Sequence, residues 1–150
     1  MSFTGVFQHS IDAKGRTSLP SRFREILAAQ NAEKLFVTTH MIDDCLVAFA
    51  PAQWDRILAR LGEQSMFDET ANLLVRSFIA PAQECAVDKL GRILIQPTLR
   101  DRAGLGEEIT WAGTVSRIEI WSPARWAEVQ KRARAPEVQT DLAKKLATIL

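Results

Sequence analysis

The stretch IDAKGRTSLPSRFRE, residues 11–25, recurs in similar form as VDKLGRILIQPTLRD, residues 87–101. Each stretch carries an aspartate, a glycine three positions later and an arginine directly after that glycine. A proline and a short segment with basic residues follow in both copies, with one more residue before the proline in the second. Two copies of one motif in a chain of 150 residues predict a duplicated structural unit.

The repetition continues beyond the two motifs. KLFVTT (34–39) and CLVAFAPAQWDRI (45–57) in the first half correspond to EEITWAG (107–113) and RIEIWSPARWAEV (117–129) in the second. The order of apolar strand-like runs, turn residues and prolines is the same in both halves. Each half is therefore predicted to fold as strand, turn, strand, short helix, strand, strand and helix.

The spacing D-x-x-G is typical of a tight turn. The aspartate side chain can accept hydrogen bonds from the turn's own backbone, and glycine tolerates the positive φ that the fourth position often needs. A tight hairpin is predicted between Asp12 and Gly15 and again between Asp88 and Gly91.

Helices are predicted where a proline precedes apolar residues at helical spacing, because proline fits the first helical turn. Asp68 is expected to cap a helix in the middle of the chain. The predicted apolar faces contain Phe23, Ile26 and Leu27; Trp54, Ile57, Leu58 and Leu61; Ala71, Leu74, Val75 and Phe78; Trp126, Val129 and Ala133; and Val138, Leu142, Leu146 and Ile149.

One half alone has an apolar strand face and too little mass to cover it, whereas two halves can bury both faces against each other. The predicted fold class is therefore α+β, with two β-hairpin units joined about a pseudo-twofold axis into a small barrel and flanked by short helices. The predicted organisation is a first half at 5–54, connecting helices at 55–80, a second half at 81–126 and a helical segment at 127–150.

Composition limits the classes of protein. Apolar residues make up 47% and charged residues 25%, so we expect an ordered chain, with disorder confined to the vicinity of 133–136. Apolar runs are too short for a membrane span, and the first residues lack the features of a secretory signal, which favours the cytoplasm. Cys45 and Cys85 are expected to be buried, reduced thiols. A net charge of +1 means that any nucleic-acid surface must be a local patch.

With these motifs, the chain resembles the MraZ family of bacterial transcriptional regulators, which have two tandem domains of the AbrB, or swapped-hairpin, type. The family pattern D-x-K-G-R-x-x-x-P is met in full by Asp12, Lys14, Gly15, Arg16 and Pro20. The second copy departs from it, because Leu occupies position 90 and the lysine is Lys89. The resemblance implies a nucleoid-associated repressor of division and cell-wall genes, its own operon included. It also implies a ring-shaped homo-oligomer that binds repeated promoter boxes in double-stranded DNA, without a cofactor or small-molecule substrate.

The residues of the first motif support contact with DNA independently of the resemblance. A lysine at a turn can attract phosphate, and a guanidinium can bond guanine edges or phosphate. The candidate DNA-binding residues are Lys14, Gly15, Arg16, Arg22 and Arg24.

Structural explanations for the same residues stay open. Lys14 could be an ordinary solvated lysine, and Arg16 could pair with Asp12 to lock the turn. For the second copy a structural or subunit-facing role is favoured, with Asp88, Gly91 and Arg92 forming the turn and Lys89 beside it.

Other clusters point less clearly to a function. HMIDDC (40–45) contains potential metal ligands but lacks paired-ligand spacing, so no metal site is predicted. His9 and Cys85 occupy equivalent positions and could meet as a Cys/His pair of a small hydrolase, but no glycine-rich oxyanion loop accompanies them. The protein is therefore predicted not to be an enzyme. The main alternative to a repressor is a protein-interaction module, such as the antidote of a toxin pair.

Overall fold

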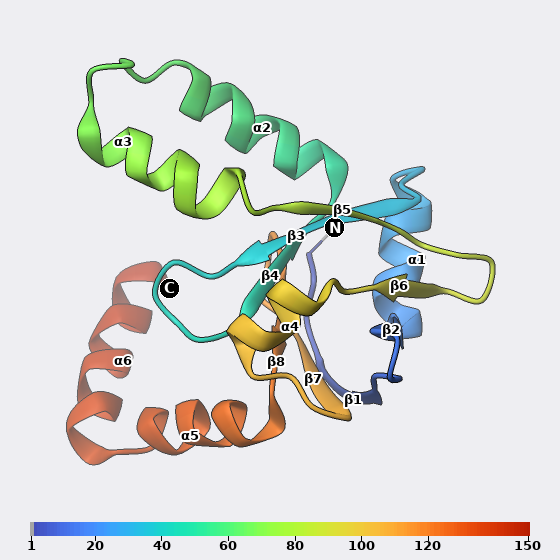
Figure 1. The fold of residues 1–150 in the computed structure, drawn as a ribbon. Helices are drawn as coiled ribbons and strands as arrows, with labels where there is room; N and C mark the ends of the chain where they lie inside the picture. Colours follow the sequence, from blue (N-terminus) through green and yellow to red (C-terminus); the bar gives the residue numbers. More distant parts are fainter. Residues whose placement is uncertain (1) are drawn as a thin grey trace.

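A computed structural model describes residues 2–150, and the predicted order of elements is present in both halves (Figure 1). The strands are β1 Val6–Ser10, β2 Arg16–Ser18, β3 Lys34–Thr39, β4 Leu46–Phe49, β5 Gln83–Ala86, β6 Arg92–Leu94, β7 Glu108–Gly113 and β8 Ile118–Trp121. The helices are α1 Ser21–Ala29, α2 Pro51–Gly62, α3 Glu69–Leu74, the π-helical η1 Val75–Ile79, α4 Pro97–Ala103, α5 Pro123–Ala133 and α6 Pro136–Ile149.

The two halves exchange their first strands. In the six-stranded antiparallel sheet β1 pairs with β7 of the second half, and β5 pairs with β3 of the first. Strands β4 and β8 join the halves at the centre of this sheet, and β2 and β6 form a separate two-stranded ribbon. Each half therefore completes the sheet of the other, which confirms an α+β fold built from a duplicated unit.

The predicted tight turns are present, and the strands that flank them pair chiefly across the halves. β1 and β2 are linked by the single bridge between Ile11 and Thr17, and each strand forms its ladder with a strand of the other half. Pairing across the halves makes β1 part of a six-stranded sheet, whereas a two-stranded hairpin alone is marginally stable.

The extra residue before Pro97 is not an insertion in the fold. α1 begins at Ser21 and α4 begins at Pro97, which is the same offset that separates Asp12 from Asp88. Pro20 is the residue before the first helix, whereas Pro97 is the first residue of its helix. Both positions suit the fixed φ of proline, so the shift of the proline does not displace the start of the helix.

The core lies between the halves. Phe23 and Leu27 of α1 pack in it with strand residues such as Leu35, Ile95 and Trp111, all nearly inaccessible to solvent. On the outer face of the first half, Trp54 stacks on Phe36 with ring centroids 5.4 Å apart and also contacts Phe78 of η1.

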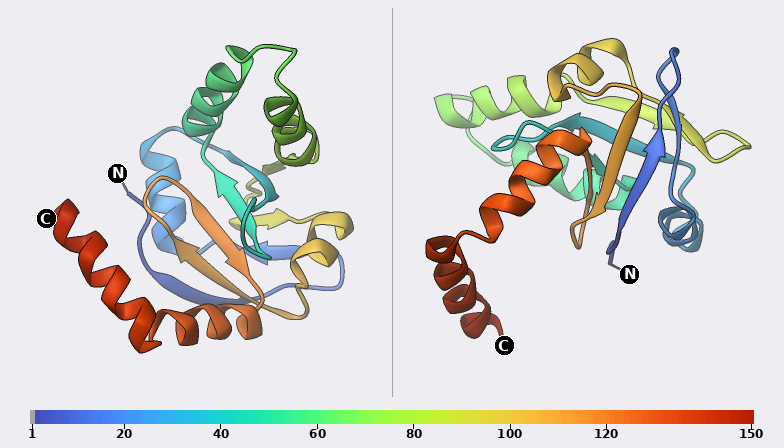
Figure 2. Two further views of the ribbon diagram at one scale, coloured as in Figure 1. Left: turned by 90° about the vertical axis from the view of Figure 1, so that its left-hand side faces the viewer. Right: turned by 90° about the horizontal axis from the view of Figure 1, so that it is seen from below.

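The helices that follow α2 in the first half and α5 in the second half are placed differently. α3 and η1 fold back along α2, and the hydroxyl of Thr38 in β3 donates to the carbonyl of Phe78 at 2.6 Å (Figure 1). α6 instead extends away from the sheet, after a sharp corner at the segment predicted to be disordered (Figure 2). Its apolar stripe is largely exposed, with Leu142 at 51%, Leu146 at 53% and Ile149 at 71%.

Candidate nucleic-acid interface

The loop between β1 and β2, which we call the first tip (residues 12–15), is organised by one carboxylate. Oδ1 of Asp12 accepts hydrogen bonds from the backbone N–H groups of Lys14 and Arg16, both at 2.9 Å. Oδ2 accepts from Nε of Arg16 at 2.9 Å. The N–H of Gly15 donates to the carbonyl of Asp12 at 3.0 Å and closes the turn.

The second tip (residues 88–91) repeats this geometry. Oδ1 of Asp88 accepts from the N–H groups of Leu90 and Arg92, and Oδ2 accepts from Nε of Arg92, all at 2.9 Å. The change from Lys14 to Leu90 therefore leaves the turn itself unaltered. Asp88, Gly91 and Arg92 are thus bonded to one another within the turn.

Each tip arginine uses only part of its hydrogen-bonding capacity within the turn. The pairing of Arg16 with Asp12, one of the two explanations left open, is observed, but it occupies Nε alone. Within residues 2–150 no hydrogen bond or ion pair engages the two terminal nitrogens of Arg16 or of Arg92. Those nitrogens carry four N–H donors per arginine that remain free for a ligand.

The pKa of the Asp12 carboxyl is lowered, chiefly by the hydrogen bond from the Arg16 backbone, and the pKa of Asp88 is lowered in the same way by Arg92. A carboxyl whose pKa is lower in the folded protein stabilises the fold above its unfolded pKa of about 4, and this stabilisation is lost as pH falls. We expect stability to decline below about pH 4. Asp12→Asn and Asp88→Asn should reduce this acid dependence in thermal melts between pH 2 and pH 6, and an unchanged pH slope would contradict it.

The candidate DNA-binding residues contact different elements of the fold. Lys14 is exposed at the first tip beside Arg16, as predicted. Arg22 lies instead on α1 near Thr4, with Nη2 3.4 Å from the threonine hydroxyl. Arg24 lies against the second tip, because a Cβ on Gly91 would lie 2.8 Å from its guanidinium carbon.

The residue that sequence reasoning missed is Arg100 on α4. A Cβ on Gly15 would lie 3.0 Å from Nε of Arg100, so this arginine lies against the first tip. Nε of Arg100 donates to the carbonyl of Ile95 at 3.0 Å, and the N–H of Ile95 donates to the carbonyl of Gly15 at 2.8 Å. Arg100 follows Arg24 in the sequence at the same separation at which Asp88 follows Asp12. This equal separation was the signal that could have identified Arg100 as the equivalent of Arg24.

The other clusters hold no comparable site. His40 accepts backbone N–H bonds from Ile42 and Asp43 at Nδ1, and its Nε2 lies 3.4 Å from Glu119, so it organises its own loop. Among residues 2–150 no group of three or more His, Cys, Asp and Glu side chains could hold a metal ion.

The Cys/His pair does not form. The thiol of Cys85 donates to the carbonyls of Gln83 and Leu94, and within residues 2–150 no hydrogen bond joins it to His9. Both cysteines are free and buried, and burial raises the pKa of the Cys85 thiol to about 11 and that of Cys45 further. Thiols with such pKa values are poor nucleophiles at neutral pH.

Comparison with known proteins places this arrangement in a family. The family model described as "MraZ protein, putative antitoxin-like" matches residues 2–77 and again residues 78–147. The chain belongs to the MraZ family. The two matches divide the chain between the first and second halves, so each MraZ unit carries one aspartate-bound tip.

Relatives in the MraZ family cover most of the chain. A protein of Symbiobacterium thermophilum named Transcriptional regulator MraZ is 37% identical over 142 residues, covering 95% of this chain and 98% of the relative. Relatives with the same name in Heliobacterium modesticaldum and Acetivibrio thermocellus are 38% and 40% identical, covering 96% and 83% of this chain and the same share of each relative. None of the helices in the described part of the chain is long and apolar enough to span a bilayer.

Proposed function

We propose that this protein is a sequence-specific DNA-binding transcriptional repressor that acts from the two tips. Its targets are repeated promoter boxes upstream of division and cell-wall genes, its own operon included. It works without a cofactor, as a nucleoid-associated protein of the cytoplasm, and assembles as a ring-shaped homo-oligomer. The pairing of exchanged strands across the halves supports an AbrB-like swapped-hairpin barrel as the unit that presents the tips.

The observation that carries the proposal is a fixed turn with free cationic donors. Asp12 holds the backbone of the first tip in one conformation, so Arg16 and Lys14 need little further ordering when DNA binds. Lys14 is exposed and suited to phosphate, and the terminal nitrogens of Arg16 are suited to phosphate or to a guanine edge. The relatives named Transcriptional regulator MraZ agree with this class of function.

Exposed apolar surfaces support the proposed self-association. Besides the stripe on α6, the connection between α2 and α3 exposes Met66 at 76% and Phe67 at 87%, and Leu73 on α3 is 63% exposed. Large apolar side chains gathered on a surface mark sites of protein association. A single tip offers few contacts, whereas specific DNA complexes need many, so several subunits per site are required.

The alternative function is a protein-interaction module such as an antidote. It is favoured by the words "antitoxin-like" in the description of the family. A protein partner that binds the exposed apolar surfaces would not need the tips. A substitution at the first tip should therefore weaken the binding of DNA and leave the binding of such a partner unchanged.

Lys14→Ala is expected to weaken binding to the DNA immediately upstream of the protein's own gene by about tenfold, because one phosphate contact is lost from each engaged subunit. The melting temperature should stay nearly unchanged, since an exposed lysine contributes little to folding. Fluorescence anisotropy and thermal melting measure the two quantities. Lys131→Ala, which also removes an exposed positive charge, here from α5, is the matched control. Equal affinity of both variants, or no binding by the unaltered protein, would count against the proposed function.

A further inference from the structure

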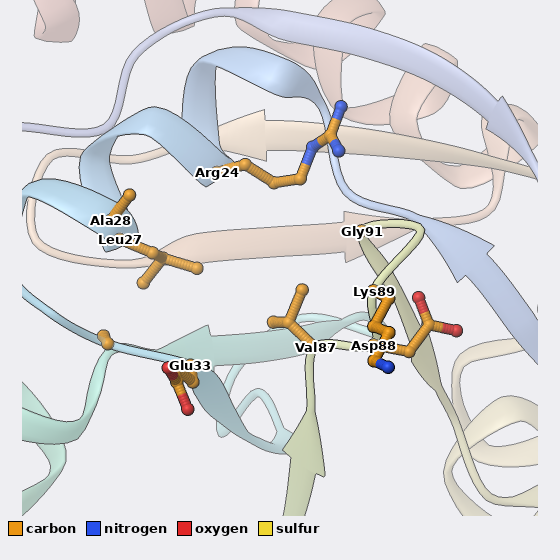
Figure 3. A pocket seen from close by; sticks show the side chains of 9 residues that line it. Arg24, Leu27, Ala28, Glu33, Val87, Asp88, Lys89 and Gly91 are labelled. Carbon is orange, nitrogen blue, oxygen red and sulfur yellow. The ribbon is translucent and has the colours of Figure 1, made fainter.

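The two tips stand beside equivalent hollows, each lined by residues of both halves. The hollow at the second tip has a volume of about 520 Å³ and lies between α1 and the tip, with Arg24 and Leu27 on one side and Val87, Asp88 and Lys89 on the other (Figure 3). The hollow at the first tip, about 560 Å³, is lined among others by Asp12, Arg100 and Glu107. In both, a helix arginine of one half faces the turn of the other.

Each of these arginines lies close against the glycine of a tip. At the first tip, Arg100 is fixed by its bond to the Ile95 carbonyl and lies over Gly15. At the second tip, the N–H of Leu19 donates to the carbonyl of Gly91 at 2.9 Å, and the stem of Arg24 lies over the same glycine. The absence of a side chain at Gly15 and Gly91 is what lets a guanidinium approach each turn.

Most of the N–H donors of these two arginines make no hydrogen bond or ion pair within the described part of the chain. Within residues 2–150 no hydrogen bond or ion pair engages Arg24, and Arg100 uses only Nε. The neighbouring carboxylates Asp12 and Asp88 are already bonded to Arg16 and Arg92. Glu33 and Glu107 also line the hollows, so an anion would bind away from these two carboxylates, between each tip and its helix arginine.

The second tip has lost no charge relative to the first. Lys89 is exposed at the position before Leu90, so each tip has one exposed lysine, one aspartate-bound arginine and one arginine from the other half. The turn is unchanged and the two helices begin at equivalent positions, so the second tip is built like the first.

We propose that each tip and the helix arginine of the other half form one composite phosphate-binding surface for DNA. Arg100 completes the surface of the first tip, and Arg24 with Lys89 completes that of the second, so each subunit contacts DNA at two places. The inference rests on the proposed function, since it names further contacts for the same ligand. Because each surface needs both halves, a half-chain would present neither.

The test compares Arg100→Ala, Arg24→Ala and Lys89→Ala with Arg60→Ala, which removes an exposed charge from α2, a helix that lines neither hollow. Binding to the upstream DNA is measured by anisotropy at several salt concentrations, and folding by thermal melting. Each of the variants Arg100→Ala, Arg24→Ala and Lys89→Ala should bind DNA about five- to tenfold more weakly. The slope of log affinity against log salt should fall by about one per engaged contact. Arg60→Ala should change neither quantity.

Arg100→Lys separates phosphate contact from support of the turn, because lysine keeps the charge but loses the planar group that bonds to Ile95. Recovery of the salt slope in this variant supports the inference. If Arg24→Ala and Lys89→Ala behave like Arg60→Ala while Lys14→Ala weakens binding, the second surface is wrong and the proposed function stands. If the unaltered protein does not bind, the proposed function itself fails.

Discussion

Affinity for DNA is expected to rise by about a hundredfold or more when a second box is placed on the same duplex, and to rise again with a third. Once one subunit of an assembly is bound, the next tip meets its box at a high effective concentration, which increases avidity without a new kind of contact. Tips on one side of a ring reach one face of a straight duplex, so the boxes should lie about 10 base pairs apart. Anisotropy with one to four boxes measures the effect.

Helical phase and assembly provide the controls for this result. An insertion of about 5 base pairs between boxes turns the second box to the opposite face and should remove most of the gain. Leu142→Glu on the exposed stripe of α6 should reduce the molar mass seen by light scattering and abolish the dependence on box number, while binding to one box persists. Binding that is indifferent to both box number and phase would exclude the repressor mechanism proposed above.

Gly15→Ala is expected to destabilise the protein by about 2 to 4 kcal/mol, which corresponds to a fall in melting temperature of roughly 5 to 15 °C for a chain of this size. Gly15 has φ +91°, a region unfavourable for any side chain. Its Cβ would also collide with the backbone oxygen of Ile95, which cannot move without disturbing the pairing of the two halves.

Gly62→Ala is the matched control, because this glycine lies in α2 with nothing within 4 Å of the added methyl group. It should be neutral or stabilising by about 0.5 kcal/mol, since alanine restricts the unfolded chain. Equal melting temperatures for the two variants would contradict the packing described for the first tip.

The turn of each tip could be predicted from the sequence because its geometry is local. Asp12, Gly15 and Arg16 are within hydrogen-bonding reach along the chain, so their spacing alone indicated the bonds that form. The same holds for the buried face of α1, where Phe23, Ile26 and Leu27 recur at helical spacing. The cap of α3 is local as well, since Asp68 accepts the N–H of Ala71.

Contacts across the halves could not be predicted in this way. Sequence proximity suggested that Arg24 belongs with Lys14, but α1 turns it toward Gly91, and Arg100 reaches the first tip from a helix far along the chain. The exchange of β1 and β5 had the same cause, because period-2 patterns show which face of a strand is buried and not which strand it pairs with.

The sequence by itself therefore determined the duplicated α+β unit, the two aspartate-bound turns and the apolar faces of the helices, all of which depend on residues close together in the chain. Only the tertiary structure decided which half supplies each strand and each helix arginine, and that α6 leaves its stripe exposed while α3 and η1 fold back. These choices depend on packing between distant segments, where several arrangements satisfy the same local pattern and burial of the shared core selects one.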